Sequence, residues 1–429
     1  MTEFKKGQRI PVTIGGDAVV MEKLGEGGQG IVYRVMYEGK EYALKWYFPK
    51  KIKYPDKFYN NLANNVSEGA PTSAFLWPQF LTKRVKGSFG YIMELRPSEY
   101  KDFSGFLLAK TRFSSVSAVV NAALNIVNGF RELHRCGFSY QDLNDGNFFV
   151  NPENGDVLIC DNDNVAPYGE SLGIAGKCRY MAPEVVLNKK RPDIHTDRFS
   201  LSVILFLLLV MNHPLEGKRT MSPCLTESLE RKYFGSEPVF MFDERDDSNR
   251  PVRGVHVNAI RLWQVYPEFI RNAFSESFSK EVMTGKVARK TDNEWQKLFV
   301  RLRDCVIACP KCGNETFVFP ERENVCINCS KSLTPLPYLK IGRNSVVLYP
   351  GKKLYKFHID PDSDDFKQLA AEVLQNTKKT SIWGLRNHSE YIWTVPGEDG
   401  AIKQIANHEV LVIAPKTVNF GRITGEIII

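Results

Sequence analysis

One polar loop and the hairpin that follows it constrain the fold of this 429-residue chain more than any other feature. The loop, SYQDLNDGN, places Asp142 and Asn147 five residues apart, directly before the apolar run FFV. A second apolar run, VLIC, ends at Asp161, and the Asn154-Gly155 pair between the runs is typical of a tight turn. The pattern predicts a short antiparallel hairpin with Asn147 just before it and Asp161 just after it.

The first fifty residues alternate apolar and polar side chains, which predicts three antiparallel strands. Gly25, Gly27 and Gly30 lie between the first two strands, where glycines let backbone N–H groups approach a phosphate without a side-chain clash. A flexible hairpin that binds nothing is the alternative for the glycines taken alone. Lys45 lies on the third predicted strand and would point back under the glycine turn toward bound phosphates, a surface lysine being the alternative.

The composition, 43% hydrophobic and 25% charged, is that of a globular protein. The longest apolar run, residues 201–211, is shorter than the ~20 residues that span a bilayer, and it predicts a buried helix. Since no stretch of signal-peptide length opens the chain, we expect a cytoplasmic protein with no membrane segment. The net charge of +8 is mild and scattered; nucleotide phosphates would satisfy it, and we do not expect a nucleic-acid partner.

Changes in residue pattern divide the chain into three predicted domains. Residues 1–304 read as strands followed mainly by helices, and residues 305–333 form a cysteine-rich segment. Valine, isoleucine and turn residues dominate residues 338–429, which predicts β structure interrupted by one helix, DDFKQLAAEVLQ, at residues 364–375.

The order of these features resembles the eukaryotic-type protein kinases over about residues 17–305, closing with MAPE at residues 181–184. The resemblance implies an α+β, two-lobed kinase fold with an antiparallel β N-lobe and a helical C-lobe. It implies that Asp142 is the base that accepts the proton of the substrate hydroxyl. It also implies that Asn147 and Asp161 hold Mg²⁺ or Mn²⁺ on the phosphates of ATP.

The same resemblance implies a set of nucleotide-binding residues. Met93 corresponds to the gatekeeper, and Glu94 and Arg96 would bind adenine through their backbones. The residues expected to bind the nucleotide or its metal are Gly25, Gly27, Gly30, Val32, Ala43, Lys45, Met93, Glu94, Arg96, Asn147 and Asp161.

Two contacts that stabilise the kinase fold in that family also have counterparts in this sequence. Glu184 of the MAPE motif is expected to pair with Arg289. Asp197, in TDRFSL, resembles the buried aspartate that braces the catalytic loop.

Two motifs depart from the family pattern. The residues before Asp142, usually His-Arg, are Tyr140-Gln141. A neutral glutamine cannot form an ion pair with a phosphorylated activation loop, so activation by phosphorylation of that loop is not expected. The residues after Asp161, usually Phe-Gly, are Asn162-Asp163, so the metal-binding aspartate is kept and the phenylalanine switch is lost.

A lysine that usually follows the catalytic base is also missing. Asn144 stands in its place, while GKCRYMAPE puts Lys177 where serine/threonine kinases usually carry a threonine. Because that segment folds next to Asp142, we hypothesise that Lys177 is a catalytic residue that replaces the missing lysine. A solvent-facing lysine is the alternative.

The helix that should present a glutamate to Lys45 has none at the expected place. The segment FYNNLANNVSEG offers Asn61, Asn64 and Asn65 near that place, and Glu68 a few residues later. Two alternatives follow from the sequence: Glu68 pairs with Lys45, or an asparagine holds Lys45 without charge.

Five of the nine cysteines lie between residues 305 and 329. Cys309-x-x-Cys312 and Cys326-x-x-Cys329 supply four thiolates for tetrahedral Zn²⁺. The pattern resembles a zinc ribbon with a structural metal, because a module this small cannot fold on its own apolar core. We expect Cys305 to take no part.

Within residues 338–429, IGRNSVVLY and GLRNHSEYIWTVPGEDGAIKQIANHEVLVIAPKTVNFGR resemble parts of a forkhead-associated domain. The resemblance implies an all-β sandwich. Such domains read phosphothreonine through an Arg, a Ser and an Asn-Gly turn, and here only Arg343 has a counterpart, while Ser389 matches poorly. A protein-docking or packing role is therefore expected over phosphopeptide reading.

More narrowly, SYQDLNDGNFFV, ICDNDNV and DRFSLSVILFLLLVMNHPLEG are similar to a divergent group of bacterial kinases. Members of that group tend to be encoded beside a metal-dependent protein phosphatase and a von Willebrand A-type protein. The resemblance implies both as partners, in addition to a protein substrate.

These observations predict a Mg·ATP-dependent serine/threonine protein kinase. The alternatives are a nucleotide-binding scaffold that recruits partners without phosphoryl transfer, and a nucleic-acid binder acting through the zinc ribbon. Lys45, Asp142, Asn147 and Asp161 favour the enzyme, because a chain that had kept only the fold would have little physical need for all four.

Overall fold

The computed structural model describes residues 3–170, 176–222, 224–320, 323–342, 344–397 and 401–429. The chain forms two compact units. The first comprises residues 1–114 and 118–296, and the second comprises residues 115–117 and 297–429.

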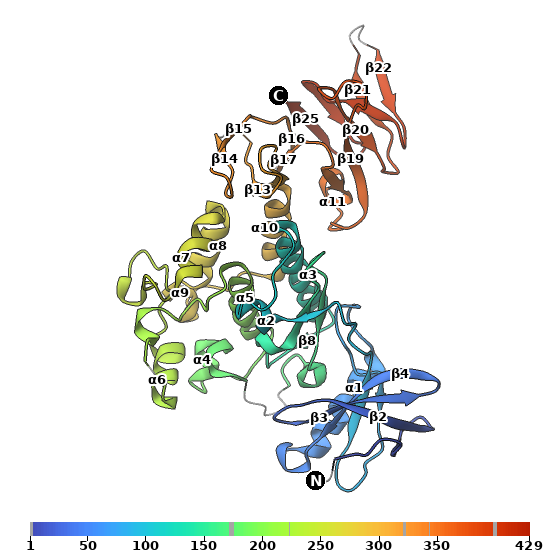
Figure 1. The fold of residues 1–429 in the computed structure, drawn as a ribbon, viewed down its shortest axis with the longest axis vertical. Helices are drawn as coiled ribbons and strands as arrows, with labels where there is room; N and C mark the ends of the chain where they lie inside the picture. Colours follow the sequence, from blue (N-terminus) through green and yellow to red (C-terminus); the bar gives the residue numbers. More distant parts are fainter. Residues whose placement is uncertain (1–2, 171–175, 223, 321–322, 343, 398–400) are drawn as a thin grey trace. The chain divides into compact units, whose positions relative to one another are not determined.

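A six-stranded antiparallel sheet, blue in Figure 1, begins the first unit, with strand order β1-β2-β3-β4-β6-β5. Alternation along β3 buries Tyr33 and Val35, and Leu44 of β4 packs with them in one apolar core. The predicted antiparallel β N-lobe is therefore confirmed. Its elements are β1 (Arg9–Pro11), β2 (Asp17–Glu26), β3 (Gly30–Tyr37), β4 (Lys40–Tyr47), α1 (Pro55–Glu68), β5 (Phe80–Leu81) and β6 (Gly90–Met93).

The hairpin predicted after the polar loop is present. β9 (Phe148–Val150) pairs antiparallel with β10 (Val157–Ile159), and β7 (Lys101–Asp102) joins the other edge of β9. The turn requires glycine, because Gly155 has φ +78° and a Cβ there would lie 2.2 Å from the backbone oxygen of Ala118.

Helices form most of the remaining first unit. The apolar run at residues 201–211 lies almost entirely in α5 (Ile194–Val210). Every residue from Phe199 to Val210 is buried, as expected for a helix that is apolar on all faces. Asp193 and Thr196 cap its N-terminus reciprocally. None of the helices in the described ranges is long and apolar enough to cross a membrane. The other helices are α2 (Phe103–Leu107), α3 (Val116–Arg135), α4 (Pro183–Val186), α6 (Glu227–Arg231), α7 (Val257–Val265), α8 (Glu268–Ser277) and α9 (Lys280–Met283), and α10 (Asp292–Asp304) begins in the first unit and ends in the second.

Two small hairpins begin the β-rich part of the second unit. β12 (Val306–Ala308) pairs with β13 (Glu315–Phe317), and β14 (Asn324–Val325) pairs with β15 (Ser332–Leu333). Each hairpin turn carries one of the CxxC pairs, so the four cysteines come from two successive turns.

Two antiparallel sheets complete the second unit, with strand orders β17-β16-β25-β24-β21-β22 and β18-β19-β20-β23. Both contribute to one apolar core that includes Leu339, Leu385 and Trp393. The expected C-terminal β region is thus confirmed. Its elements are β16 (Tyr338–Ile341), β17 (Asn344–Val347), β18 (Lys353–Tyr355), α11 (Lys356–Ile359), β19 (Leu369–Gln375), β20 (Trp383–Asn387), β21 (Trp393–Pro396), β22 (Ile402–Ile405), β23 (Val410–Val412), β24 (Lys416–Asn419) and β25 (Thr424–Ile428).

The predicted helix at residues 364–375 is wrong. Residues Leu369–Gln375 form β19, which is hydrogen-bonded between β18 and β20. Alanine, glutamate, leucine and glutamine favour helices in isolation, but pairing on both edges and burial of Ala371 and Val373 override that preference.

Candidate functional site

The loop that carries Asp142 is fixed by a buried aspartate. The Asp197 carboxylate accepts hydrogen bonds from the backbone N–H groups of Tyr140 (2.5 Å) and Gln141 (3.1 Å). Gln141 has φ +70°, a left-handed conformation that costs free energy and needs such support. The bracing role expected for Asp197 is confirmed.

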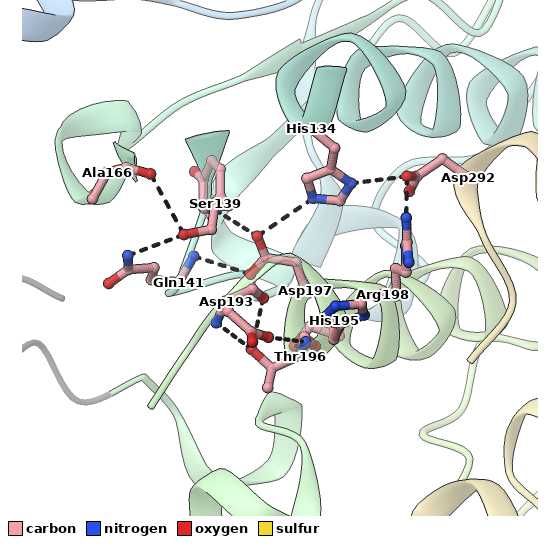
Figure 2. A network of polar contacts seen from close by, with 12 residues as sticks. His134, Ser139, Gln141, Ala166, Asp193, His195, Thr196, Asp197, Arg198 and Asp292 are labelled. Carbon is pink, nitrogen blue, oxygen red and sulfur yellow. Dashed lines mark hydrogen bonds and ion pairs between the residues drawn. The ribbon is translucent and has the colours of Figure 1, made fainter. Parts of the chain in front are cut away.

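Figure 2 shows that the same aspartate belongs to a larger network. The His134 ring lies between Asp197 (3.5 Å) and Asp292 (2.9 Å), and Asp292 also pairs with Arg198 (3.7 Å). Burial lowers the pKa of His134, but the two carboxylates outweigh burial and raise that pKa to about 9. His134 is therefore a buried cation that joins α3 to the start of α5.

Asp142 lies in a half-buried position between the loop and the segment after Asp161. One carboxylate oxygen accepts a hydrogen bond from the Asn164 side chain (3.3 Å), and the other has no hydrogen-bond partner among the described residues. Burial, together with the charges of Asp161 and Asp163, raises the pKa of Asp142 to about 6. The carboxylate is therefore ionised near neutral pH and has a free oxygen.

The hairpin places Asn147 beside the segment that contains Asp161. The backbone N–H of Cys160 donates to the Asn147 backbone oxygen at 2.8 Å. The Asn147 side-chain oxygen accepts from the Asn144 N–H at 2.7 Å and retains a second lone pair. Asp161 has φ +56° and a side chain that is 48% exposed, so its carboxylate is open to a ligand.

Lys45 is buried and is held by two carboxylates. Its Nζ lies 2.7 Å from Asp163 and 3.2 Å from Asp161. Burial lowers the pKa of Lys45, but the two carboxylates outweigh this effect and raise the pKa above its usual range. The Tyr47 hydroxyl also donates to Asp163, on the oxygen that binds Lys45.

Both alternatives for the partner of Lys45 are therefore wrong. Asn61 and Asn65 donate their side-chain amides to the Val165 backbone oxygen at 2.8 and 3.0 Å, and Asn64 and Glu68 are exposed. The carboxylates that hold Lys45 come instead from the loop after β10. The available signal was a second aspartate where the family has glycine.

Lys177 contacts the polar loop. Its Nζ lies 2.8 Å from the Asn144 side-chain oxygen and 3.5 Å from the Asp145 carboxylate. Asn144 occupies the position where the family usually has a lysine. The Lys177 ammonium therefore lies beside the position of the missing lysine. The Lys177 side chain is 58% exposed and is free to change partner.

Of the three glycines predicted to lie between the first two strands, only Gly27 does so, because Gly25 lies within β2 and Gly30 begins β3. A Cβ added to Gly25 or Gly27 would meet nothing within 4 Å, which leaves room for a ligand. Gly30 differs, because a Cβ there would lie 2.1 Å from the Trp46 backbone oxygen. Close packing of β3 on β4 is thus the local reason for glycine at residue 30.

The apolar residues expected to line an adenine site belong to one cluster. Ala43 and Met93 are buried in it, and Val32 and Phe149 pack against it half-buried. Phe149 was not singled out from the sequence.

The side chains of Glu94 and Arg96 point to other partners. Glu94 pairs with Lys40 at 2.8 Å, while Arg96 donates to the Tyr100 backbone oxygen and lies over the Phe149 ring. Contacts with adenine through the backbones of Glu94 and Arg96 remain a prediction.

The pair expected between Glu184 and Arg289 is confirmed. Two nitrogens of the Arg289 guanidinium each lie 2.8 Å from a different carboxylate oxygen of Glu184. This bidentate geometry ties the MAPE segment to the end of the helical lobe.

The protein kinase domain family matches residues 18–248, which is more than half of the chain. The chain belongs to the protein kinase family. Similar curated proteins match 44–49% of the chain. They include the serine/threonine-protein kinase PRR2 of Saccharomyces cerevisiae, 28% identical over 204 residues, and beta-adrenergic receptor kinase 1 of Mesocricetus auratus, 30% identical over 219 residues. A third is the dual specificity protein kinase shkB of Dictyostelium discoideum, 28% identical over 223 residues.

The kinase spans only part of these relatives. The matched segments cover 44%, 48% and 49% of this chain and 28%, 30% and 33% of the three relatives in the same order. The chain therefore matches about a third or less of the length of each of these relatives.

The four cysteines of the second unit meet in one place. The sulfur atoms of Cys309, Cys312, Cys326 and Cys329 all lie within 4.8 Å of one another, and two of the pairs are 3.7 and 3.9 Å apart. Four sulfurs bound 2.3 Å from a tetrahedral zinc would lie about 3.8 Å apart. The donor set and its spacing therefore fit Zn²⁺.

The hydroxyl of Ser389 is engaged inside the C-terminal β region. It donates to the Asn387 side-chain oxygen (2.7 Å) and accepts from the Trp393 indole N–H (3.1 Å). Arg343, the other residue compared with a phosphothreonine site, lies outside the described residues.

Proposed function

We propose that this chain is a Mg·ATP-dependent protein kinase that transfers the γ-phosphoryl group to serine or threonine hydroxyls of a partner protein. One observation carries the proposal: residues 160–164 contact all three other parts of the expected site. Asp161 pairs with Lys45 (3.2 Å), Asn164 bonds to Asp142 (3.3 Å), and Cys160 bonds to the backbone of Asn147 (2.8 Å). Groups far apart in sequence thus surround one short segment.

In this proposal Asp142 takes the proton of the acceptor hydroxyl. Its free carboxylate oxygen has the lone pair required, and the bond from Asn164 fixes the other oxygen. A pKa near 6 keeps the base ionised at neutral pH while leaving it more basic than an ordinary aspartate.

The phosphates would be held by charge and by backbone. Lys45 supplies a buried positive charge, and the open space beside Gly25 and Gly27 leaves room for phosphates next to the backbone. Asn147 and Asp161 offer an amide and a carboxylate oxygen, the donor types that Mg²⁺ prefers. When bound, the metal would neutralise the charge of the transferring group.

We further propose that Lys177 supplies the cation that Asn144 lacks. The 2.8 Å bond between the two supports this exchange, since a bond to Asn144 brings the ammonium to the loop that carries Asp142. The Lys177 charge also lowers the pKa of Asp142, in opposition to burial and the neighbouring carboxylates.

Phosphosite mapping by mass spectrometry tests the proposal. The full chain is incubated with ATP and Mg²⁺ or Mn²⁺, alone and with a metal-dependent protein phosphatase of the kind encoded beside similar kinases as candidate substrate. Phosphoserine or phosphothreonine formed by the wild type but not by Asp142→Ala is the expected result. Phosphotyrosine alone would contradict the acceptor assignment, and absence of any phosphosite would contradict the transfer.

A nucleotide-binding scaffold is the second candidate function. It is favoured by one observation, namely that the buried face of α1 presents no carboxylate to Lys45. A scaffold would bind Mg·ATP, show no phosphosite, and still recruit its partners.

We propose that the chain has three domains. A kinase domain at residues 1–304 is followed by a structural zinc ribbon at residues 305–333 and by a forkhead-associated-like sandwich at residues 338–429. Zinc would hold the two hairpin turns together. Because Ser389 is engaged internally, we propose protein docking for the sandwich, with the phosphatase and a von Willebrand A-type protein as candidate partners in bacterial signalling. Four zinc-binding thiolates suit a reducing cytoplasm, where we place the protein.

A further inference from the structure

The buried ammonium of Lys45 needs a negative partner, and helix α1 supplies none. The buried side chains of α1 are Phe58, Asn61, Leu62 and Asn65, two apolar residues and two neutral amides. The acidic residues of α1 point elsewhere, since Asp56 pairs with Arg84 and Glu68 is exposed.

The two carboxylates that do reach Lys45 differ in their surroundings. The Asp163 side chain is fully buried and 2.7 Å from the ammonium, whereas Asp161 is 48% exposed and 3.2 Å away. The exposed Asp161 carboxylate is open to a metal ion from solvent, whereas the Asp163 oxygen that faces the ammonium is already bonded to Lys45 and Tyr47. If Asp161 binds Mg²⁺, its charge serves the metal and Asp163 remains as the partner of Lys45.

Neighbouring groups fix Asp163 in this position. The Tyr47 hydroxyl, two residues from Lys45 on β4, donates to the oxygen that faces the ammonium. On the other side, the Asn162 side chain donates to the backbone oxygens of Leu76 and Ile159, both at 2.9 Å. The loop is thus bonded on both sides of Asp163.

Helix α1 is attached to this loop through neutral contacts. Asn61 and Asn65 both donate to the Val165 backbone oxygen, two residues after Asp163. The helix therefore supports the end of the loop, while the loop itself supplies the charge.

We propose that Asp163 is the positioning residue that holds Lys45 for nucleotide binding, in place of a carboxylate on helix α1. The role of Lys45 toward the nucleotide rests on the proposed function. The ion pair then joins β4 directly to the metal-binding loop, so it forms without any rotation of α1. Asp163 touches neither the nucleotide nor the acceptor and acts through Lys45.

Binding of Mg·ATP to the full chain, measured by calorimetry, tests this inference. Asp163→Asn keeps the shape and removes the charge, and we expect affinity at least about tenfold weaker than wild type. Glu68→Gln is the matched control and should bind like the wild type. Unchanged binding by Asp163→Asn, or a loss with Glu68→Gln, would overturn the proposal.

A second readout does not depend on nucleotide binding. Trace labelling with acetic anhydride modifies amines that the reagent can reach, and the pair with Asp163 holds the Lys45 amine in a buried position. Asp163→Asn should therefore increase the rate of labelling at Lys45 about tenfold, as followed by mass spectrometry of the peptide. An unchanged rate in a folded variant would contradict the pairing.

The pH profile separates positioning from a general loss of structure. Removing the Asp163 charge lowers the pKa of Asp142, so the acidic limb of kcat/KM should move to lower pH in Asp163→Asn. If the variant does not fold, Tyr47→Phe replaces it and should weaken Mg·ATP binding about threefold, unchanged binding being the contrary result. If the wild type transfers no phosphate, the proposed function fails, while the binding and labelling results still decide the role of Asp163.

Discussion

The Asp142 carboxylate is poised by its neighbours. Burial raises its pKa, the charges of Asp161 and Asp163 raise it further, and Lys177 and Lys45 lower it, for a value of about 6. An aspartate in water has a pKa near 4 and would be a weaker base.

A pH-dependent activity follows for the free enzyme. The base must be ionised, so we expect kcat/KM to be full above pH 7 and to fall as the pH decreases through about 6. Initial rates between pH 5 and pH 8, at substrate concentrations well below KM, would measure the limb. A limb near pH 4 would show that Asp142 is not the titrating base.

The proposal that Lys177 replaces the lysine missing at position 144 can be tested by substitution. Lys177→Ala should lower kcat about tenfold, because the ammonium beside Asn144 is lost, while Lys177→Arg should retain much of it. Lys189→Ala, at an exposed lysine beyond the MAPE segment, is the matched control. If Lys177→Ala and the control behave alike in steady-state assays, the exchange hypothesis is wrong.

At this scale the sequence predicts the residues whose order defines the family. Lys45, Asp142 and Asp161 could be located because each stands at a fixed place in a local motif. Asp163 could not be assigned to Lys45, because the 2.7 Å ion pair joins residues 118 positions apart and depends on how the loop folds.

Among the elements, α3 and α5 are joined by a charged contact. His134 has a pKa of about 9, raised from 6.5 because Asp197 and Asp292 outweigh the effect of burial. Since the folded pKa lies above the unfolded one, this contribution is complete below about pH 6.5 and is lost as the pH rises through about 9.

The expected result is a pH-dependent loss of stability on substitution. His134→Gln should cost about 3 kcal/mol at pH 6 and much less above pH 9. Denaturant unfolding at both pH values measures it, with His195→Gln, an exposed histidine of α5, as the control. A cost that does not change with pH would mean that His134 contributes packing alone.

The two small hairpins that carry the cysteines should depend on bound zinc for their folded structure. Cys312→Ser should abolish binding of one zinc equivalent per chain and unfold residues 305–333, since the apolar cluster around these cysteines is small. Zinc content by atomic absorption and proteolysis of this segment provide the readouts. Cys136→Ser, at an exposed cysteine of the first unit, should retain the metal; equal zinc content in both variants would exclude the site.

Helices and strands could be predicted where their pattern of apolar residues is long or is bounded by a clear turn sequence. Alternation gave the N-terminal strands, the Asn-Gly turn gave the β9–β10 hairpin, and continuous apolar character gave α5. Residues 369–375 were assigned to a helix because their composition favours one. Their partners, β18 and β20, lie outside the segment, and local propensity does not report them.

The whole molecule combines a kinase unit with a cysteine- and β-rich unit. In the kinase unit, the family match to residues 18–248 agrees with the arrangement of the expected site residues around residues 160–164. In the second, the two CxxC pairs predicted a zinc site, whereas the loose resemblance of residues 338–429 to a forkhead-associated domain indicated β structure without indicating a ligand. The internal bonds of Ser389 illustrate why, since a motif residue can serve the core of its own domain.

The central claim is that groups brought together around residues 160–164 transfer phosphate. The most direct measurement is incorporation of label from ATP labelled in its γ-phosphate, by the full chain with Mg²⁺, beside Asp142→Ala and Lys45→Ala. We predict label in the wild type and a decrease of at least about a hundredfold in both variants. Equal labelling of the wild type and both variants, or none in any of them despite tight Mg·ATP binding, would contradict the account.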